Sequence, residues 1–274
     1  MNKYIMRFHH YQHAAFHAAS THPLEFTVTE DDRIAAGARA HDIDDRMAAI
    51  ADSGIRMLFA EDDADYPSSL RAAQICPPVL FVRSDTFTHH FFRDRAKIAV
   101  VGTRDPSDYG LKATRTVVEG IRKADEDAVI VSGLSVGVNT EAHTQAIEQG
   151  LSTIAVLPCG LDTIYPLCNF NLAQTVARTP GSALVSPFAP GTQPSAPLML
   201  ARNRVVAALC RQTVVVESRV RGGALVLARM AHSLGRSVLA VPGRIGDPRS
   251  EGCNNLIWSR EAEIYHQSDM RITY

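Results

Sequence analysis

Short apolar, often β-branched runs alternate with helix-like segments through most of this chain, and this alternation constrains the fold more than any other feature. The runs are KIAVVG (97–102), AVIVSG (128–133), STIAVLPCG (152–160), ALVS (183–186), TVVVE (213–217) and SVLAVPG (237–243). Continuously apolar strands are typical of a parallel sheet that helices cover on both faces. The sequence therefore predicts an α/β fold of the extended Rossmann-like kind, with a doubly wound, mainly parallel sheet.

The N-terminal part of the chain has a different pattern. Residues 1–50 predict a small, mostly helical, acidic region, and residues 51–274 predict the Rossmann-like domain, whose first strands and short helix fall within 54–85. Four histidines (His9, His10, His13 and His17) share helical spacings in the first segment, but no acidic residue accompanies them there. A surface or partner-facing helix is therefore favoured over a metal site.

Composition excludes several classes of protein. Hydrophobic residues make up 46% of the chain and charged residues 21%, which excludes a wholly disordered chain and a disulfide scaffold. No apolar run has the length of a membrane span, and the first twenty residues do not resemble a signal peptide, so we expect a cytoplasmic protein without a membrane partner. The five cysteines are widely spread and contain no C-x-x-C pair, which favours reduced thiols.

Charge is distributed unevenly along the chain. Residues 30–65 hold eleven acidic and four basic side chains, whereas residues 200–250 hold nine arginines and two acidic residues. This asymmetry favours an anionic ligand near the C-terminal half, although a solvated basic surface would show the same counts. The excess of arginine over lysine suits bidentate phosphate contacts, and a GC-rich genome would produce the same bias.

Glycines follow several predicted strands, where a backbone without a Cβ atom can approach an anion. The first such loop contains Gly102, Thr103 and Arg104, and the second runs from Ser132 and Gly133 to Gly137. Neither loop has the G-x-G-x-x-G pattern or the G-K-[ST] pattern, so neither a dinucleotide cofactor nor ATP hydrolysis is indicated and no cofactor is expected. A glycine after a strand also serves simple turn geometry.

Two arginine-containing stretches precede helices near the same predicted sheet edge. They are Arg202-Asn203-Arg204 and the segment that leads from Arg219 through Arg221 to Gly222 and Gly223. Guanidinium groups and helix N-termini at these positions could meet a phosphodiester, although such arginines could also lie over helix ends. The chain shows no nucleophile motif, which argues against an enzyme and leaves a nucleoside phosphoribohydrolase as a minor alternative.

The strings IAVVGTRDPSDYG, VIVSGLSVG, TIAVLPCGLDTIYP, RNRVVAAL, GRSVLAVPG and DPRSEGCNNLI resemble, in this order and spacing, the DprA/Smf DNA-processing family. The resemblance covers about residues 54–260. It implies an extended Rossmann fold that binds and protects single-stranded DNA without hydrolysis, loads the RecA recombinase and forms a homodimer. Many family members append a C-terminal winged-helix domain, but this sequence ends shortly after the last of these strings, so we expect no such domain here.

Carried over to this sequence, the family motifs give a candidate DNA-binding set. Its members are Gly102, Thr103, Arg104, Ser132, Gly133, Gly137, Met199, Arg202, Asn203, Arg204, Arg221, Gly222 and Gly223. Four departures from the family motifs weaken the usual surface: Met199 replaces an aromatic residue, Val136 replaces an arginine, Asn139 replaces an aspartate, and the turn after Arg221 lacks its usual hydroxyls. These losses leave open a second hypothesis, a Rossmann-like sensor that binds a small nucleotide in the same pocket.

Overall fold

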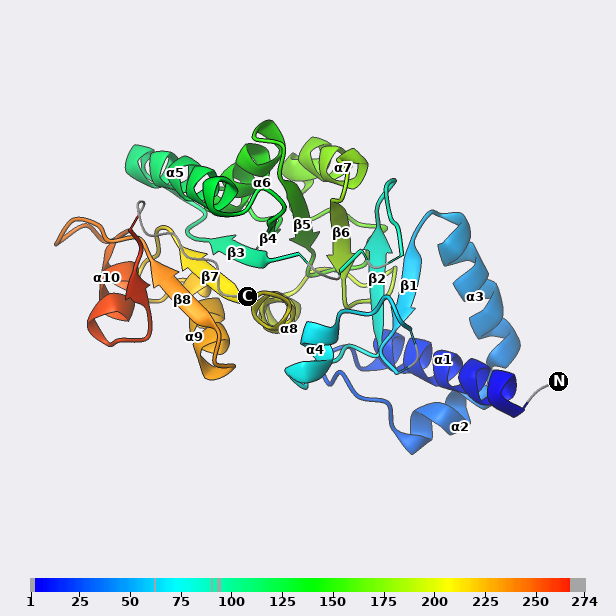
Figure 1. Ribbon diagram of the computed structural model, residues 1–274. Coiled ribbons are helices and arrows are strands. Elements are labelled where there is room, and N and C mark those ends of the chain that lie inside the picture. The colour runs from blue at the N-terminus through cyan, green and yellow to red at the C-terminus, as the bar shows by residue number, and fades with distance from the viewer. Residues whose placement is uncertain (1–2, 62, 90, 93–94, 267–274) are drawn as a thin grey trace.

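The computed structural model describes residues 3–61, 63–89, 91–92 and 95–266, and within these ranges one sheet of nine strands runs through the whole molecule (Figure 1). The strand order is β1-β2-β6-β5-β4-β3-β7-β8-β9. The strands are β1 (Arg56–Phe59), β2 (Val79–Arg83), β3 (Lys97–Val101), β4 (Val129–Gly133), β5 (Ser152–Val156), β6 (Ala183–Ser186), β7 (Gln212–Val215), β8 (Ser237–Ala240) and β9 (Glu263–Ile264). Strands β3 to β9 pair in parallel, and β1 and β2 add an antiparallel extension beside β6. The predicted α/β fold is confirmed.

The helices of this fold connect strands or precede the sheet. They are α1 (Lys3–Thr21), α2 (Glu30–Ala38), α3 (Ala40–Asp52), α4 (Ser68–Ala72), α5 (Asp108–Ala124), α6 (Val138–Glu148), α7 (Phe170–Arg178), α8 (Ala196–Leu209), α9 (Gly223–Ser233) and α10 (Glu251–Trp258), with a 3-10 turn η1 at Leu167–Asn169. Helices α5, α6 and α7 lie on one face of the sheet, and α4, α8 and α9 lie on the other (Figure 1).

The apolar pattern of the strands explains why both faces are covered. In β3, Ile98 and Val100 join the core beneath α5 and α6, whereas Ala99 and Val101 join the core on the face of α8 and α9. Successive residues of a strand point to opposite faces, so a strand that is apolar at every position needs a helix layer on each side.

The connections reverse direction at β3. From β3 the sheet grows through β4, β5 and β6 to one side, and the chain then returns to place β7, β8 and β9 on the other side. Open α/β sheets bind ligands outside the carboxyl ends of the strands at such a reversal.

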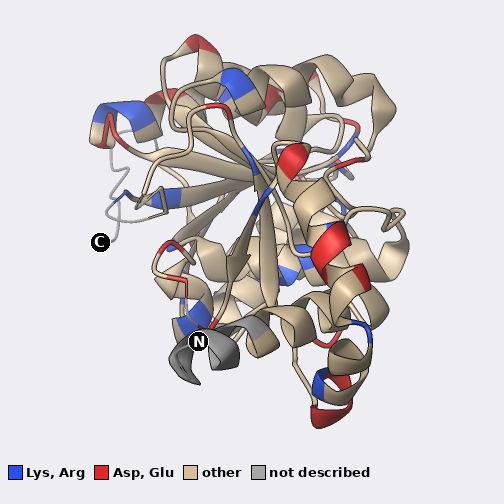
Figure 2. Cartoon of the chain, turned by 90° about the vertical axis from the view of Figure 1, so that its right-hand side faces the viewer, with Lys and Arg blue, Asp and Glu red and all other residues tan. Residues whose placement is uncertain are grey.

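The N-terminal helices pack against the antiparallel extension of the sheet. Phe16 of α1 is fully buried and meets Phe81 of β2 edge to face, with 6.5 Å between ring centroids. His13 is also buried and lies 2.8 Å from Asp44, so α1 is not a surface helix at this position, and a partner-facing role of its exposed side stays a prediction. Most of the acidic side chains of this region belong to α2 and α3, which lie on the side of the molecule that faces the viewer in Figure 2.

Two predicted helix boundaries also change. The sequence predicts a helix that begins just after Arg202-Asn203-Arg204, but α8 begins at Ala196 and contains all three residues. The residue types after the second glycine loop predict Thr140 as the N-cap of the next helix, but α6 begins three residues earlier than that cap implies, with Gly137 as its N-cap residue. The Thr140 hydroxyl lies inside the first turn and donates to the carbonyl of Ser135 at 3.0 Å. A glycine with a positive φ of 83° makes this earlier start possible.

Candidate nucleic-acid interface

A pocket of about 340 Å³ lies at the carboxyl ends of β3, β4 and β7, beside the reversal of strand order. Helices α8 and α9 complete its wall. We call it the strand-end pocket. Its lining residues are Val101, Gly102, Thr103, Arg104, Gly133, Ser135, Asn139, Met199, Arg202, Asn203, Ser218, Arg219, Gly222, Gly223, Ala224 and Leu227.

The first two glycine loops lie against each other at the edge of this pocket. A Cβ atom on Gly102 would lie 2.7 Å from the Val138 side chain and 2.9 Å from the Glu217 carbonyl oxygen, so only glycine fits without a shift. The N–H group of Thr103 donates to that Glu217 carbonyl at 2.7 Å, and the N–H group of Val138 donates to the Thr103 carbonyl at 3.1 Å. These contacts fix the loop that carries Arg104.

Arg202 forms the floor of the pocket. Its side chain fills the space beside Gly133, where a Cβ atom would collide with the guanidinium group. Its Nη1 donates to the Val156 carbonyl at 2.7 Å, and its Nε donates to Asn203 Oδ1 at 3.1 Å. Burial, followed by the nearby charge of Arg104, lowers the pKa of Arg202 to about 10, so the side chain remains a cation at neutral pH. A buried cation without a carboxylate partner is costly and favours an anionic ligand.

Arg104 stands above this floor and is exposed to solvent. Its Nη2 lies 3.4 Å from the thioether sulfur of Met199 on α8. In the part of the chain that the structure describes, no ion pair joins a carboxylate to Arg104 or Arg202. The pocket therefore presents two guanidinium groups whose charges no carboxylate offsets.

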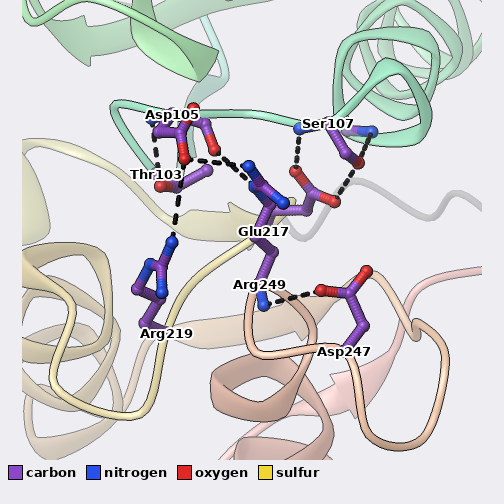
Figure 3. Close-up of polar contacts among 8 residues, drawn as sticks. Thr103, Asp105, Ser107, Glu217, Arg219, Asp247 and Arg249 are labelled. Atoms are coloured by element: carbon purple, nitrogen blue, oxygen red, sulfur yellow. Dashed lines mark hydrogen bonds and ion pairs between the residues drawn. The ribbon is translucent and has the colours of Figure 1, made fainter.

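Two acidic residues near the pocket, Asp105 and Glu217, have other partners, which Figure 3 shows. The buried Glu217 carboxylate accepts hydrogen bonds from the backbone N–H and the hydroxyl of Ser107, at 2.9 and 2.5 Å. The Asp105 carboxylate lies 3.0 Å from Arg249 and 3.7 Å from Arg219. Both contacts hold the Arg104 loop in place, and Asp105 partly neutralises the third arginine of the pocket lining.

The structure gathers nine of the predicted site residues around the pocket. They are Gly102, Thr103, Arg104, Gly133, Met199, Arg202, Asn203, Gly222 and Gly223. They come from four separate segments, which the fold brings to one sheet edge because the carboxyl ends of parallel strands meet there.

Two of the predicted residues support the loops from below. Ser132 is fully buried in β4 and donates its hydroxyl hydrogen to the Val100 carbonyl at 2.7 Å. Gly137 lies outside the lining, and a Cβ atom there would lie 2.5 Å from the Thr103 carbonyl oxygen. Both positions therefore set the geometry of the loops.

Two of the predicted arginines point elsewhere. The guanidinium group of Arg204 lies 5.4 Å from the ring centroid of Phe26, in the connection between α1 and α2. Arg221 is exposed and lies outside the lining of the pocket. Residues two apart on a helix point in different directions, so Arg202 of α8 lines the pocket and Arg204 of the same helix does not.

Seven lining residues were not in the predicted set: Val101, Ser135, Asn139, Ser218, Arg219, Ala224 and Leu227. Asn139 is 8% exposed, and its Oδ1 makes no hydrogen bond within the described part of the chain. The signal that could have placed it is its position in the second glycine motif, where the family resemblance gives an aspartate.

His143 is a structural residue beneath the pocket. Its Nε2–H group donates to the Gly133 carbonyl at 3.0 Å, and its Nδ1 lies 2.7 Å from the Thr153 hydroxyl. Complete burial, reinforced by the charge of Arg202, lowers the pKa of His143 to about 4. The neutral imidazole thus connects β4 and β5 to α6 at the position of the second glycine loop.

Other kinds of site receive no support from the described residues. No group of three or more His, Cys, Asp or Glu side chains in these ranges is arranged to hold a metal ion. In the same ranges, no helix combines the length and the apolar character that crossing a membrane requires.

Comparison with known proteins assigns this chain to a family. Residues 57–273 match the family of DNA recombination-mediator protein A. The chain belongs to this family. It is 38% identical over 199 residues to the DNA processing protein DprA of Streptococcus pneumoniae, and this alignment covers 73% of the chain and 67% of that protein. It is 39% identical over 200 residues to protein Smf of Escherichia coli, of which it spans about half (52%). The predicted membership of the DprA/Smf family is confirmed.

Solved structures of family members share this fold. The X-ray structure of DprA from Streptococcus pneumoniae superposes with a TM-score of 0.73 at 34% identity, covering 85% of this chain and 78% of that one. A structure of DprA from Helicobacter pylori, described for its single-stranded DNA binding mode, has a TM-score of 0.68 at 28% identity and covers 78% of this chain and 93% of that one.

Proposed function

We propose that this chain binds single-stranded DNA in the strand-end pocket and acts as a recombination mediator without catalysing a reaction on the strand. The observation that carries the proposal is the pair of arginines without carboxylate partners, Arg104 at the rim and the buried Arg202 at the floor. Membership of the recombination-mediator family and the DNA-binding description of the Helicobacter pylori relative support the same ligand.

Backbone groups add to the positive potential at this edge. The glycine loops place N–H groups at the ends of β3 and β4, and the N-terminus of α9 opens at Gly222 and Gly223. Backbone N–H groups and helix N-termini contact phosphates without reading the base sequence. Binding should therefore depend little on base sequence and strongly on salt concentration.

The lining also supports binding without catalysis. Among its described residues the polar side chains are arginine, asparagine, serine and threonine, and none of them is a histidine, cysteine, lysine, tyrosine or carboxylate. A nucleophile needs a neighbouring base to activate it, and a general acid needs a tunable pKa. The pocket can orient phosphates, but it has no group to move a proton.

The experiment that tests this proposal measures fluorescence anisotropy of a labelled oligonucleotide of about 30 nucleotides, as single strand and as duplex. The wild type should bind the single strand more tightly. Arg104→Ala should weaken that binding roughly tenfold, because one charge-assisted phosphate contact is lost. Arg178→Ala, which removes an exposed arginine from the end of α7, should leave it unchanged. Equal losses in the two variants would contradict a site at the pocket.

We extend the proposal to the partners of the family: the chain protects single strands, loads RecA on them, and does so as a cytoplasmic homodimer. Family membership is the support for these steps. Loading is tested by RecA-dependent strand exchange on DNA coated with single-strand-binding protein. The chain should relieve the inhibition by that coat, and sedimentation should show a dimer at the same concentration. No relief, or a monomer that relieves fully, would contradict this extension.

A small nucleotide remains the second candidate ligand, because the volume of about 340 Å³ falls in the range of small-molecule sites. Ala224 and Leu227 also line the wall where the usual turn carries hydroxyls. A mononucleotide that binds the folded chain should raise its melting temperature in proportion to the logarithm of ligand concentration. No shift at millimolar ligand would remove this candidate.

A further inference from the structure

We propose that the strand-end pocket binds a terminal phosphate monoester in preference to an internal phosphodiester, and that Asn139 sets this preference. The inference rests on the proposed function, because it specifies which phosphate of a strand the pocket takes. The ligand class is a phosphate carried on one ester bond, as at the end of a DNA strand or in a free mononucleotide.

The first step is the charge of the pocket. Arg104 and Arg202 both line it, and neither forms an ion pair within the described part of the chain. Two acidic side chains near the pocket have other partners: Asp105 pairs with Arg219 and Arg249, and Glu217 accepts from Ser107. Two positive charges therefore face one pocket without an offsetting negative charge.

The second step is burial at the floor. Arg202 is 6% exposed, so water cannot solvate its guanidinium group as it does on the surface. The hydrogen bonds from its Nη1 and Nε go to neutral oxygens, those of Val156 and Asn203. Neutral acceptors satisfy the hydrogen-bonding groups without balancing the charge, and an anion in the pocket would do both.

The third step places Asn139 in the same pocket as this cation. Asn139 and His143 lie one helical turn apart on α6, and His143 donates to the Gly133 carbonyl at 3.0 Å. Gly133 in turn contacts the guanidinium group of Arg202. Asn139 therefore lies on the helix face that meets the floor of the pocket, and it is the lining residue of that face.

The fourth step is the chemistry of an amide at this position. The side chain of Asn139 is 8% exposed, and its Oδ1 has no hydrogen-bond partner in the described structure. Rotation of the amide about its last bond can turn its NH₂ group to a phosphate oxygen instead. An aspartate here would add a negative charge close to Arg202. The neutral amide leaves both guanidinium charges available to the ligand.

The fifth step compares the two kinds of phosphate. An internal phosphodiester carries one negative charge, whereas a phosphate monoester carries about 1.5 to 2 at pH 7, because its second pKa is about 6. Two guanidinium groups that no carboxylate pairs with in the described structure balance the charge of a monoester more closely than that of a diester. The preference should therefore depend on pH in the range where the second proton is released.

The experiment measures the affinity of the full chain for three oligonucleotides of one sequence, with 5′-phosphate, 3′-phosphate or only hydroxyl ends, each labelled internally. A phosphorylated end should bind about fivefold more tightly than the hydroxyl form at pH 7.5, and the difference should shrink at about pH 5.5. Competition with the mononucleotide dAMP, set against its nucleoside, distinguishes a free monoester from a strand end. Equal affinities for phosphorylated and hydroxyl strands would overturn the proposal.

Three variants assign the preference to Asn139. Asn139→Asp should abolish it, because the carboxylate would pair with Arg202, and Asn139→Ser should keep it, because the charge is unchanged. Asn171→Asp makes the same charge change at an exposed position of α7 outside the pocket and should also keep it. Circular dichroism verifies that each variant is folded. A full preference in folded Asn139→Asp, or its loss in Asn139→Ser, would overturn the role of Asn139.

The outcomes separate this inference from the proposed function. Strands that bind equally well with and without a terminal phosphate would refute the monoester inference and leave DNA binding in place. Binding of dAMP without binding of any strand would refute DNA binding and support the monoester pocket. Absence of both would refute both.

Discussion

Arg104 and Arg202 carry the same charge in different environments, and this difference divides their roles. Arg202 is buried and hydrogen-bonded to the sheet, so it gives the pocket a fixed positive floor. Arg104 is exposed beside Met199, so it can move to meet a phosphate. A fixed charge costs little reorganisation when the ligand arrives, and a mobile one adapts to its position.

Asp105 forms ion pairs with Arg219 and Arg249 at the edge of the pocket. Its carboxylate lies 3.7 and 3.0 Å from these side chains. Asp105→Asn should therefore release both arginines and tighten single-strand binding about two- to fivefold, a small gain because the pairs are exposed. Asp108→Asn is the matched control, since Asp108 is an exposed carboxylate of the next turn outside the pocket. A similar gain in both variants would show that net charge alone is responsible.

His143 should make the stability of the fold depend on pH. Its pKa is about 4 in the folded chain against an ordinary value of 6.5, so between these values the unfolded chain binds more protons. The contribution of this residue to the free energy of unfolding is complete above about pH 6.5 and falls by about 2 kcal/mol at pH 5. Urea unfolding of wild type and His143→Gln at both pH values measures it. The wild type should lose more stability than the variant, and equal losses would contradict a neutral buried imidazole.

Helix α8 contributes side chains both to the strand-end pocket and to a contact with the N-terminal region. Arg202 points to the pocket, whereas Arg204 lies over the ring of Phe26, which is 9% exposed in the connection between α1 and α2. The helix thus ties the N-terminal connection to the element that forms the pocket floor.

This arrangement gives a prediction that separates the two arginines. Arg204→Ala should lower the free energy of unfolding by about 0.5 to 1 kcal/mol, because a cation–π contact is lost. Its single-strand affinity should stay within about twofold of wild type, because Arg204 does not line the pocket. Chemical denaturation and anisotropy test the two halves of this prediction. A loss of affinity as large as that of Arg104→Ala would show that Arg204 contacts DNA.

At the scale of the whole molecule, the apolar runs of the sequence predict the sheet, and the glycines that follow them predict the sheet edge at which the pocket lies. Each parallel strand from β3 to β8 overlaps one of the predicted apolar runs, because burial on both faces leaves no room for alternation. The glycine loops and Arg104 follow the carboxyl ends of those strands, and Arg202 reaches the same edge from α8, which is why nine predicted residues meet in one pocket.

The remaining features depend on contacts between distant segments. The residues around Arg204 in the sequence do not predict its contact with the ring of Phe26. Those around His13 do not predict its burial next to Asp44. Phe16 likewise packs on Phe81 across the predicted boundary at residue 50, and that boundary stays a prediction. Such contacts follow from tertiary packing, which overrides the surface character that composition alone favours.

The central claim is that phosphates of a single strand lie in the strand-end pocket on Arg104, and the salt dependence of binding tests it most directly. Dissociation constants of wild type, Arg104→Ala and Arg178→Ala are measured between about 50 and 200 mM salt. The slope of log Kd against log salt should fall by about 0.7 in Arg104→Ala, because one phosphate is no longer neutralised, and should not change in Arg178→Ala. Identical slopes in all three proteins would contradict a phosphate contact at Arg104 and with it the proposed site.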